Sequence, residues 1–286
     1  MNLRWARLVT AVMALVLCGS VWLAGQTPGA DATTSSENDG WFERVSRTQA
    51  EQPHWITPLA TVTPRLEEEF RFDFIRQQLP GGGQNANFGA GKGLEIIPAR
   101  NIEVILTVPA YVTHNRPGAQ NGWGDSGFLV KYRLCASNET KGNYILTVFF
   151  ATSFPTATHG NGAPHAVFTP TIAAGKGWGN FDVQSTFSVG IPSAERPLLG
   201  TPLAWNTAFQ YRVLKKLWPE LEVNSTFWPN GTLGGEKQAF LTPGLVIGHI
   251  PLHNRLGLTF GTGMQIAATR FHPYNHAWIF SVRCPF

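Results

Sequence analysis

The last ten residues of the chain alternate between two faces. One face carries apolar and aromatic side chains and the other a more mixed set, divided as follows: Trp278, Phe280, Val282, Cys284 and Phe286 on the first, and Ala277, Ile279, Ser281, Arg283 and Pro285 on the second. A period of two predicts a β-strand lying between unlike environments. This strand by itself fits the closing strand of a soluble sandwich and that of a membrane barrel equally well.

The same alternation recurs along most of the chain. Three phenylalanines interleave with Glu69, Arg71 and Asp73, and residues 181–189 and 203–212 repeat the pattern. No stretch has the pattern of a long amphipathic helix. With turn residues at short intervals, this predicts about twelve strands. The expected strands are residues 66–77, 93–97, 102–112, 127–135, 144–153, 166–173, 181–191, 203–213, 221–227, 238–249, 256–268 and 277–286.

The charged residues of these strands favour one of the two architectures. Unpaired charges cannot lie in the dry core of a sandwich, whereas a membrane barrel is apolar outside and polar inside along every strand. An even number of strands and longer connectors at alternate positions, such as 113–126 and 154–165, also fit a barrel. We therefore expect an all-β fold, a transmembrane antiparallel up-and-down β-barrel of about twelve strands. A soluble exported β-sandwich is the alternative.

The first residues of the chain predict export. They contain no acidic residue up to position 30, carry Arg4 and Arg7, and run apolar from residue 8 to 24, which is the pattern of a secretory signal peptide. An uncleaved anchor is the alternative, because the apolar run is long. The expected division of the chain is a signal peptide at 1–26, a loose periplasmic segment at 27–64 and an outer-membrane barrel at 65–286, in the cell outer membrane of a Gram-negative-type envelope.

Composition narrows the function. Only 14% of the residues are charged and 12% are aromatic, and the net charge of +4 falls to about +2 without Arg4 and Arg7. This excludes a disordered chain and a nucleic-acid-binding surface. The histidines lack a spacing that converges on a metal, no Ser–His set is singled out, and residues 89–93 lack the Ser or Thr that follows the lysine of a phosphate loop. We expect no catalytic residue, metal site or cofactor.

Two cysteines remain after the expected export. By the alternation, Cys135 lies on the polar face of its strand with Lys131 and Arg133, whereas Cys284 lies on the apolar face of the last strand. We therefore expect no disulfide between them.

Inward-facing charges of a barrel line its lumen and set its selectivity. The candidates have mixed signs, which predicts internal pairing and no strong preference for ion charge. They are Glu69, Arg71, Asp73, Glu103, Lys131, Arg133, Asp182, Arg212, Glu222 and Arg283. Outward-facing aromatic residues are expected to form girdles at the membrane interfaces or to serve assembly. These candidates are Trp123, Trp178, Trp278, Phe280 and Phe286.

The middle of the chain resembles a known family. Four motifs carry the resemblance: Asn-Ile-Glu-Val at 101–104, Pro-Ala-Tyr at 109–111, Gly-Trp-Gly-Asp-Ser-Gly-Phe-Leu-Val-Lys-Tyr-Arg-Leu at 122–134 and Ser-Phe-Pro-Thr at 153–156. They are similar to motifs of the "MetA-pathway of phenol degradation" family of outer-membrane β-barrel proteins, although Ala157 replaces a glycine of the family. The resemblance spans about residues 65–286. It implies a barrel that passes small, often aromatic or hydrophobic, compounds across the outer membrane.

We therefore expect an outer-membrane channel or transporter for small, aromatic or hydrophobic solutes, and not an enzyme. A bore of twelve strands is expected to be narrow or partly occluded. Two alternatives remain: a rim enzyme that hydrolyses lipid or peptide through a loop Ser or His, and a structural or adhesive barrel that binds a partner without conducting. The expected partners are outer-membrane lipids, the assembly machinery that would read Phe286, and a small-molecule solute. Nucleic acid is not expected, and the oligomeric state is left open.

Overall fold

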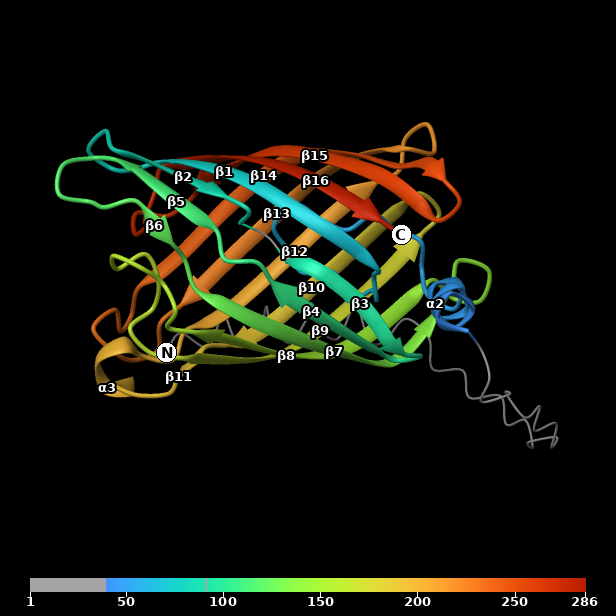
Figure 1. The fold of residues 1–286 in the computed structure, drawn as a ribbon, viewed down its shortest axis with the longest axis horizontal. Coiled ribbons are helices and arrows are strands. Elements are labelled where there is room, and N and C mark those ends of the chain that lie inside the picture. The colour runs from blue at the N-terminus through green and yellow to red at the C-terminus, as the bar shows by residue number, and fades with distance from the viewer. Residues whose placement is uncertain (1–39, 91) are drawn as a thin grey trace. The chain divides into compact units, whose positions relative to one another are not determined.

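The structure is a computed structural model and describes residues 40–90 and 92–286. The expected signal peptide at 1–26 and the first part of the expected periplasmic segment lie outside the described residues. The described part is an all-β barrel with two helices (Figure 1). None of its helices is long and apolar enough to cross a membrane.

Strands make up most of the described residues, and their pairings are all antiparallel. The strands are β1 Glu69–Gln78, β2 Gln84–Phe88, β3 Gly93–Ala99, β4 Ile102–Thr107, β5 Tyr111–Asn115, β6 Gly122–Trp123, β7 Ser126–Ser137, β8 Tyr144–Phe154, β9 Val167–Trp178, β10 Phe181–Val189, β11 Ile191–Pro192, β12 Leu203–Tyr211, β13 Leu217–Phe227, β14 Lys237–His253, β15 Leu256–Ala267 and β16 His276–Pro285. The helices are α2 Trp41–Ala50 and α3 Arg196–Leu199.

The first and last strands close the barrel. β1 pairs with β16 over its whole length, from Glu69 opposite Pro285 to Gln78 opposite His276. Four barrel strands consist of two pieces each, namely β2 with β3, β4 with β5, β6 with β7, and β10 with β11. Counted in this way the barrel has twelve strands, and the expected fold class is confirmed.

The outer parts of the second to fourth strands differ from expectation. Residues 80–92 and 113–126 were expected to be loops, but they contain β2, the end of β5, and β6. β2 reads Gln-Asn-Ala-Asn-Phe and has polar residues on both faces. A strand without an apolar face gives no alternation to recognise, so its pairing with β1 and β5 has to define it.

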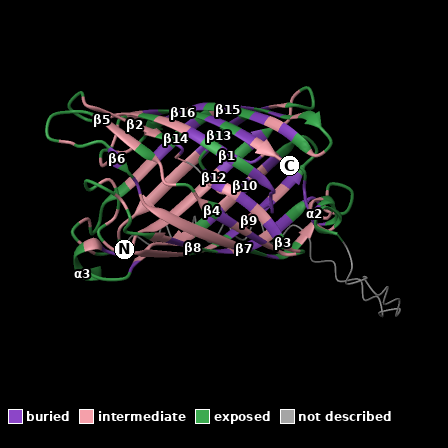
Figure 2. Cartoon of the chain, in the orientation of Figure 1, coloured by how far each residue is buried: buried purple, intermediate pink, exposed green. Residues whose placement is uncertain are grey.

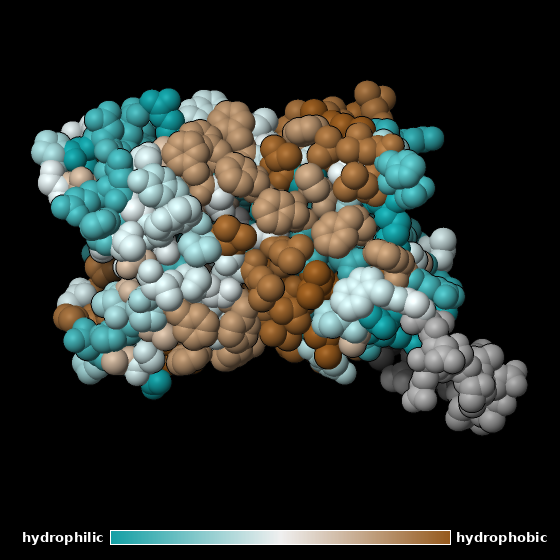
Figure 3. Space-filling view, viewed as in Figure 1, coloured by the Kyte–Doolittle hydropathy of each residue, from teal (hydrophilic) through white to brown (hydrophobic). Residues whose placement is uncertain are grey.

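The two faces of the barrel wall differ as a membrane barrel requires. On β1, Phe70 and Phe72 are 42% and 43% exposed, whereas Arg71 and Asp73, which alternate with them, are each 4% exposed. Figure 2 shows that buried and exposed residues alternate along many strands. In Figure 3, apolar side chains cover the middle of the visible face between two hydrophilic ends.

The two ends of the barrel carry connectors of different length. At the end where β1 begins and β16 finishes, the turns are short, as at 100–101 and 254–255. At the opposite end the connectors are longer, as at 155–166 and 228–236. Outer-membrane barrels have short periplasmic turns and long outer loops. We call the first end the short-turn end and the second the long-loop end.

The segment at 27–64 was expected to be loose, but the part of it that the structure describes is ordered. α2 lies at the short-turn end, and residues 52–68 then run inside the barrel. Most residues of this luminal segment are buried. Most of its bonded backbone groups pair with side chains of the wall, such as Glu222, and it forms no β-ladder with a strand. This explains why the segment has no hydrophobic period.

Candidate functional site

The expected luminal residues lie on the inner face of the wall, with one exception. Nine of them are buried and alternate with exposed apolar residues: Glu69, Arg71, Asp73, Glu103, Lys131, Arg133, Asp182, Glu222 and Arg283. Arg212 follows β12 at the short-turn end, is partly exposed, and donates from Nη2 to Asn180 Oδ1 at 3.2 Å. Of the expected girdle residues, Trp123, Trp178, Trp278 and Phe280 are exposed and Phe286 is partly exposed.

Two glutamates of β13 hold one side of the luminal segment. The Glu222 carboxylate accepts hydrogen bonds from the backbone N–H groups of Ala60 at 2.7 Å and Thr61 at 2.6 Å. Glu220 accepts from the N–H of Leu59 at 3.1 Å. The three consecutive N–H groups are therefore fixed by two carboxylates of one strand.

Two arginines hold the other side of the same turn. Arg71 on β1 and Arg283 on β16 face each other across the closing pair. Both donate to the carbonyl of Pro58, at 3.3 Å and 3.0 Å, and Arg283 also donates to Thr57 O. Arg71 forms an ion pair with Asp73 at 2.8 Å. The backbone carbonyls thus satisfy guanidinium donors that would otherwise be buried without acceptors.

The end of the luminal segment is bound by β4 and β7. Lys131 Nζ lies 2.9 Å from Glu103 Oε1 and donates to the carbonyl of Arg65 at 2.9 Å. Glu103 accepts from the N–H of Glu67 at 2.6 Å. This ion pair is fully buried, so each charge depends on its partner and on the segment. The mixed signs expected in the lumen are therefore paired internally at this position.

Small residues of the wall make room for the two large side chains of the segment. Leu59 lies against Gly244, Gly261 and Gly263, where an added Cβ would meet its methyl groups at 2.5 to 2.7 Å. Trp55 lies in the same way over Gly175. The inner wall is thus shaped to the luminal segment, and side chains at these positions would exclude it.

Two inward groups close to the short-turn end, Lys92 and Glu95, were missed by sequence reasoning. Lys92 Nζ lies 3.8 Å from Glu95 Oε1, and these two groups and Glu69 Oε1 have no hydrogen-bond partner within residues 40–90 and 92–286. Glu95 alternates with Leu94 and Ile96, so the alternation could have found it. Glu220 was missed because the strand was expected to begin one residue later.

In the half of the lumen nearer the long-loop end, neutral side chains are bonded to one another. Asn224 Nδ2 donates to Asn206 Oδ1 at 3.4 Å, Gln265 Nε2 donates to Asn224 Oδ1 at 3.1 Å, and Tyr274 Oη donates to Gln265 Oε1. Tyr274 also stacks on Phe240, with ring centroids 4.6 Å apart. Burial raises the pKa of Tyr274, in a loop, to about 12, so this phenol is neutral at physiological pH. We call these five residues the neutral ladder.

Comparisons with known proteins agree with this architecture. No protein-family model matches the sequence, and no curated protein matches it. The fold is similar to the crystal structure of an outer membrane channel from Pseudomonas putida F1, with a TM-score of 0.55, 11% identity, and coverage of 76% of this chain and 94% of that chain. At this identity the likeness establishes a shared fold.

That channel is of the MetA-pathway type that the sequence motifs resemble. A Salmonella typhi OmpF complex with daunomycin has a TM-score of 0.36 and 9% identity, and the match covers 76% of this chain and 96% of that chain.

Proposed function

We propose that this protein is an outer-membrane channel for small solutes, closed at rest by its own luminal segment. The observation that carries this proposal is the way residues 52–68 are held. Side chains of the wall bind its backbone, as Glu222 binds Ala60 and Thr61, and the segment forms no β-pairing with the wall. Such a segment can leave the lumen without breaking the barrel.

The solutes that fit this lumen are small and uncharged, with an aromatic or other apolar part. The neutral ladder offers amide and hydroxyl groups beside the rings of Phe240 and Tyr274, which is a polar surface with an apolar neighbour. Deeper in the lumen, the charges of Arg71, Asp73, Lys131 and Glu103 are paired with one another and bound to the luminal segment. They therefore give little attraction for an ion of either sign.

The proposed location is the outer membrane, with the long-loop end outward. The exposed apolar wall and the aromatic residues at its margins support contact with lipid. The proposed partners are accordingly the surrounding lipids, the assembly machinery that inserts the barrel, and the solute itself.

A reversible crosslink tests whether the segment must move. Leu59 Cδ2 lies 2.5 Å from the position of a Cβ on Gly261, so cysteines at these two positions come close to disulfide geometry. The variant is L59C/G261C with Cys135 and Cys284 replaced by serine, and the same serine protein without the pair is the control. In planar bilayers, we expect the oxidised protein to be silent and the reduced protein to conduct.

Two results would contradict the proposal in different ways. A serine control that never opens in long bilayer recordings, and a reduced pair variant that admits no small solute in liposome swelling, would exclude a channel whose segment can leave the lumen. Equal conductance of the oxidised and reduced proteins would leave a channel in place but exclude movement of the luminal segment as the step that opens it.

A further inference from the structure

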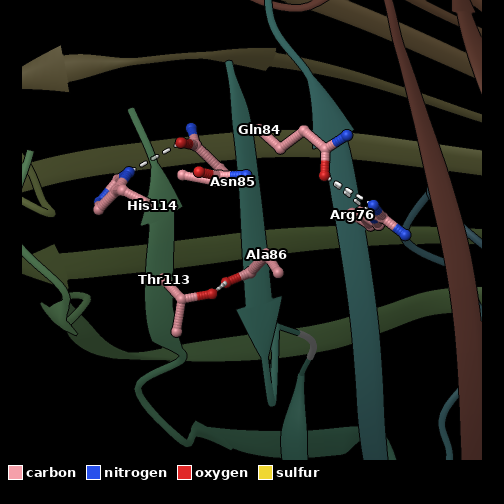
Figure 4. A pocket seen from close by; sticks show the side chains of 7 residues that line it. Arg76, Gln84, Asn85, Ala86, Thr113 and His114 are labelled. Carbon is pink, nitrogen blue, oxygen red and sulfur yellow. Dashed lines mark hydrogen bonds between the residues drawn. The ribbon is translucent and has the colours of Figure 1, made fainter. Parts of the chain in front are cut away.

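The outer surface of the wall has a small polar pocket near the long-loop end. Its volume is about 140 Å³, and it lies over three neighbouring strands, β1, β2 and β5 (Figure 4). It is lined by Arg76, Gln84, Asn85, Ala86, Thr113, His114 and Asn115. One lining residue is a cation and none is acidic. The pocket is separate from the luminal segment and from the neutral ladder.

The strand register places this pocket directly beyond an aromatic row. Phe74 is opposite Phe88 and Phe280, Phe88 is opposite Tyr111, and Tyr111 is opposite Trp123. The rings of Phe74 and Phe88 are 5.0 Å apart, and those of Tyr111 and Trp123 are 5.2 Å apart. Such a row of exposed rings marks the boundary between hydrocarbon and headgroups.

In the next outward row, Arg76, Ala86 and Thr113 take the places that rings occupy on β1, β2 and β5. Arg76 is opposite Ala86 on one side and Trp278 on the other, and Ala86 is opposite Thr113. Because residues that are opposite share a face and the face alternates along each strand, Arg76, Ala86 and Thr113 point the same way as Phe74. Ala86 has the smallest side chain in this row, and the pocket lies above it.

The guanidinium of Arg76 is held in place beside the pocket. Its Nε and Nη2 donate to Gln84 Oε1 at 3.2 Å and 2.7 Å, and Gln84 Nε2 donates in turn to Gln78 Oε1 at 2.9 Å. Nη1 takes no part in these bonds. Asn85 and His114 contact each other, Oδ1 to Nδ1 at 2.7 Å, and by the alternation their side chains lie on the inner face of the same strands.

We propose that this pocket binds a phosphate group of a lipid in the outward-facing leaflet. Arg76 supplies the charge and a planar set of donors that match phosphate, the gap over Ala86 supplies the space, and the row of Phe74 and Phe88 receives the acyl chains. The proposal rests on the outer-membrane orientation proposed above. It assigns a headgroup site to one position on the rim.

Lipid retention by purified protein tests this site. The probe is lipid A added to detergent-solubilised protein, with and without its phosphates, and bound lipid is counted by native mass spectrometry. Two variants attack the pocket differently, R76Q by removing the charge and A86L by filling the gap. The matched control is K237Q, which removes another cation at the same end, where Lys237 lies over Phe227 at 6.0 Å.

We expect the wild-type protein to bind one phosphorylated lipid A. R76Q and A86L are each expected to weaken this binding at least about tenfold, which is about 1.4 kcal/mol, and K237Q is expected to change it less than twofold. Unchanged binding by both pocket variants, equal binding of dephosphorylated lipid A, or displacement of the lipid by millimolar inorganic phosphate would overturn the proposal. The assay needs no conductance, so failure of the channel proposal is recognised separately.

Discussion

At the residue scale, one leucine and three glycines decide whether the luminal segment fits. A valine at Gly261 would meet Leu59 first, since the other neighbours of its Cβ are 3.5 Å away or more. Overpacking of this kind costs about 1–3 kcal/mol. We expect Gly261→Val to raise single-channel activity in planar bilayers by weakening the seating of the segment.

The size-compensating double variant is the control for this prediction. Leu59→Ala removes the methyl groups that the new valine would meet, so Leu59→Ala with Gly261→Val should return the channel towards the closed state. An open frequency in the double variant equal to that of Gly261→Val would show that the valine acts on the wall and not through Leu59.

A second residue-scale prediction concerns the carboxylate that binds two N–H groups. Glu222→Gln replaces one acceptor oxygen by an NH₂ group, which then faces a donor of Ala60 or Thr61. Losing a buried hydrogen bond to a charged group costs about 1.5–3 kcal/mol. We expect a higher open probability at constant pH, measured in bilayers, with Glu236→Gln in an exposed outer connector as the control. The same open probability in both variants would contradict the assigned role.

The entry of the luminal segment has a pH-dependent contact. Glu139, in the turn between β7 and β8, accepts from the backbone N–H of His54 and lies 2.9 Å from its ring. Burial acts to raise the pKa of Glu139, but the hydrogen bonds from His54 outweigh it and lower the pKa. The contribution of this contact is therefore present above the unfolded pKa of about 4.3 and is lost as the pH falls through the lower folded value.

Hydrogen exchange checks this contact locally. We expect protection factors around His54 to fall at pH below about 4, and Glu139→Gln to lower them at pH 7 with little further change in acid. The effect should be modest, because both groups are partly exposed. Protection that does not change with pH in the wild-type protein would exclude this role for Glu139.

At the scale of elements, alternation located all twelve strands of the wall, but it missed the polar piece β2 and did not predict what fills the barrel. All twelve expected strands are present because a wall between lipid and a polar lumen needs apolar and polar residues in turn. Residues 52–68 lack any period because their partners are side chains from many strands, such as Glu222 and Arg283. A contact between residues more than a hundred positions apart leaves no local pattern in the sequence.

An irregularity in β7 shows a second limit of alternation. Cys135 was expected on the inner face with Lys131 and Arg133, but it is exposed. The pairing with β8 shifts between Arg133 and Cys135, with Thr147 and Leu146 as consecutive partners. A β-bulge of this kind reverses the faces beyond it. The inner face was therefore predicted correctly for Lys131 and Arg133 but wrongly for Cys135.

At the scale of the whole molecule, Phe286 lies next to the strand pair that closes the barrel, β1 and β16, and to the end of the luminal segment. The N–H of Phe286 donates to the carbonyl of Glu68, the last residue of the luminal segment, at 3.1 Å, and Arg255 donates to the carbonyl of Phe286 at 3.5 Å. β16, which precedes Phe286, pairs with both β1 and β15. A change at Phe286 can therefore act on assembly in the cell or on the closed barrel itself.

Deletion of Phe286 separates these two roles. If the terminal ring is read during assembly, deletion should reduce the barrel found in cell membranes several-fold, measured as the compact form on an unheated gel, while the purified chain still refolds in detergent. Phe286→Tyr keeps an aromatic end and should behave as wild type. Protein that does assemble without Phe286 should conduct as the intact channel does, because the Glu222 and Arg283 contacts remain. Equal loss in cells and in detergent would instead assign Phe286 to barrel closure, through its bond to Glu68.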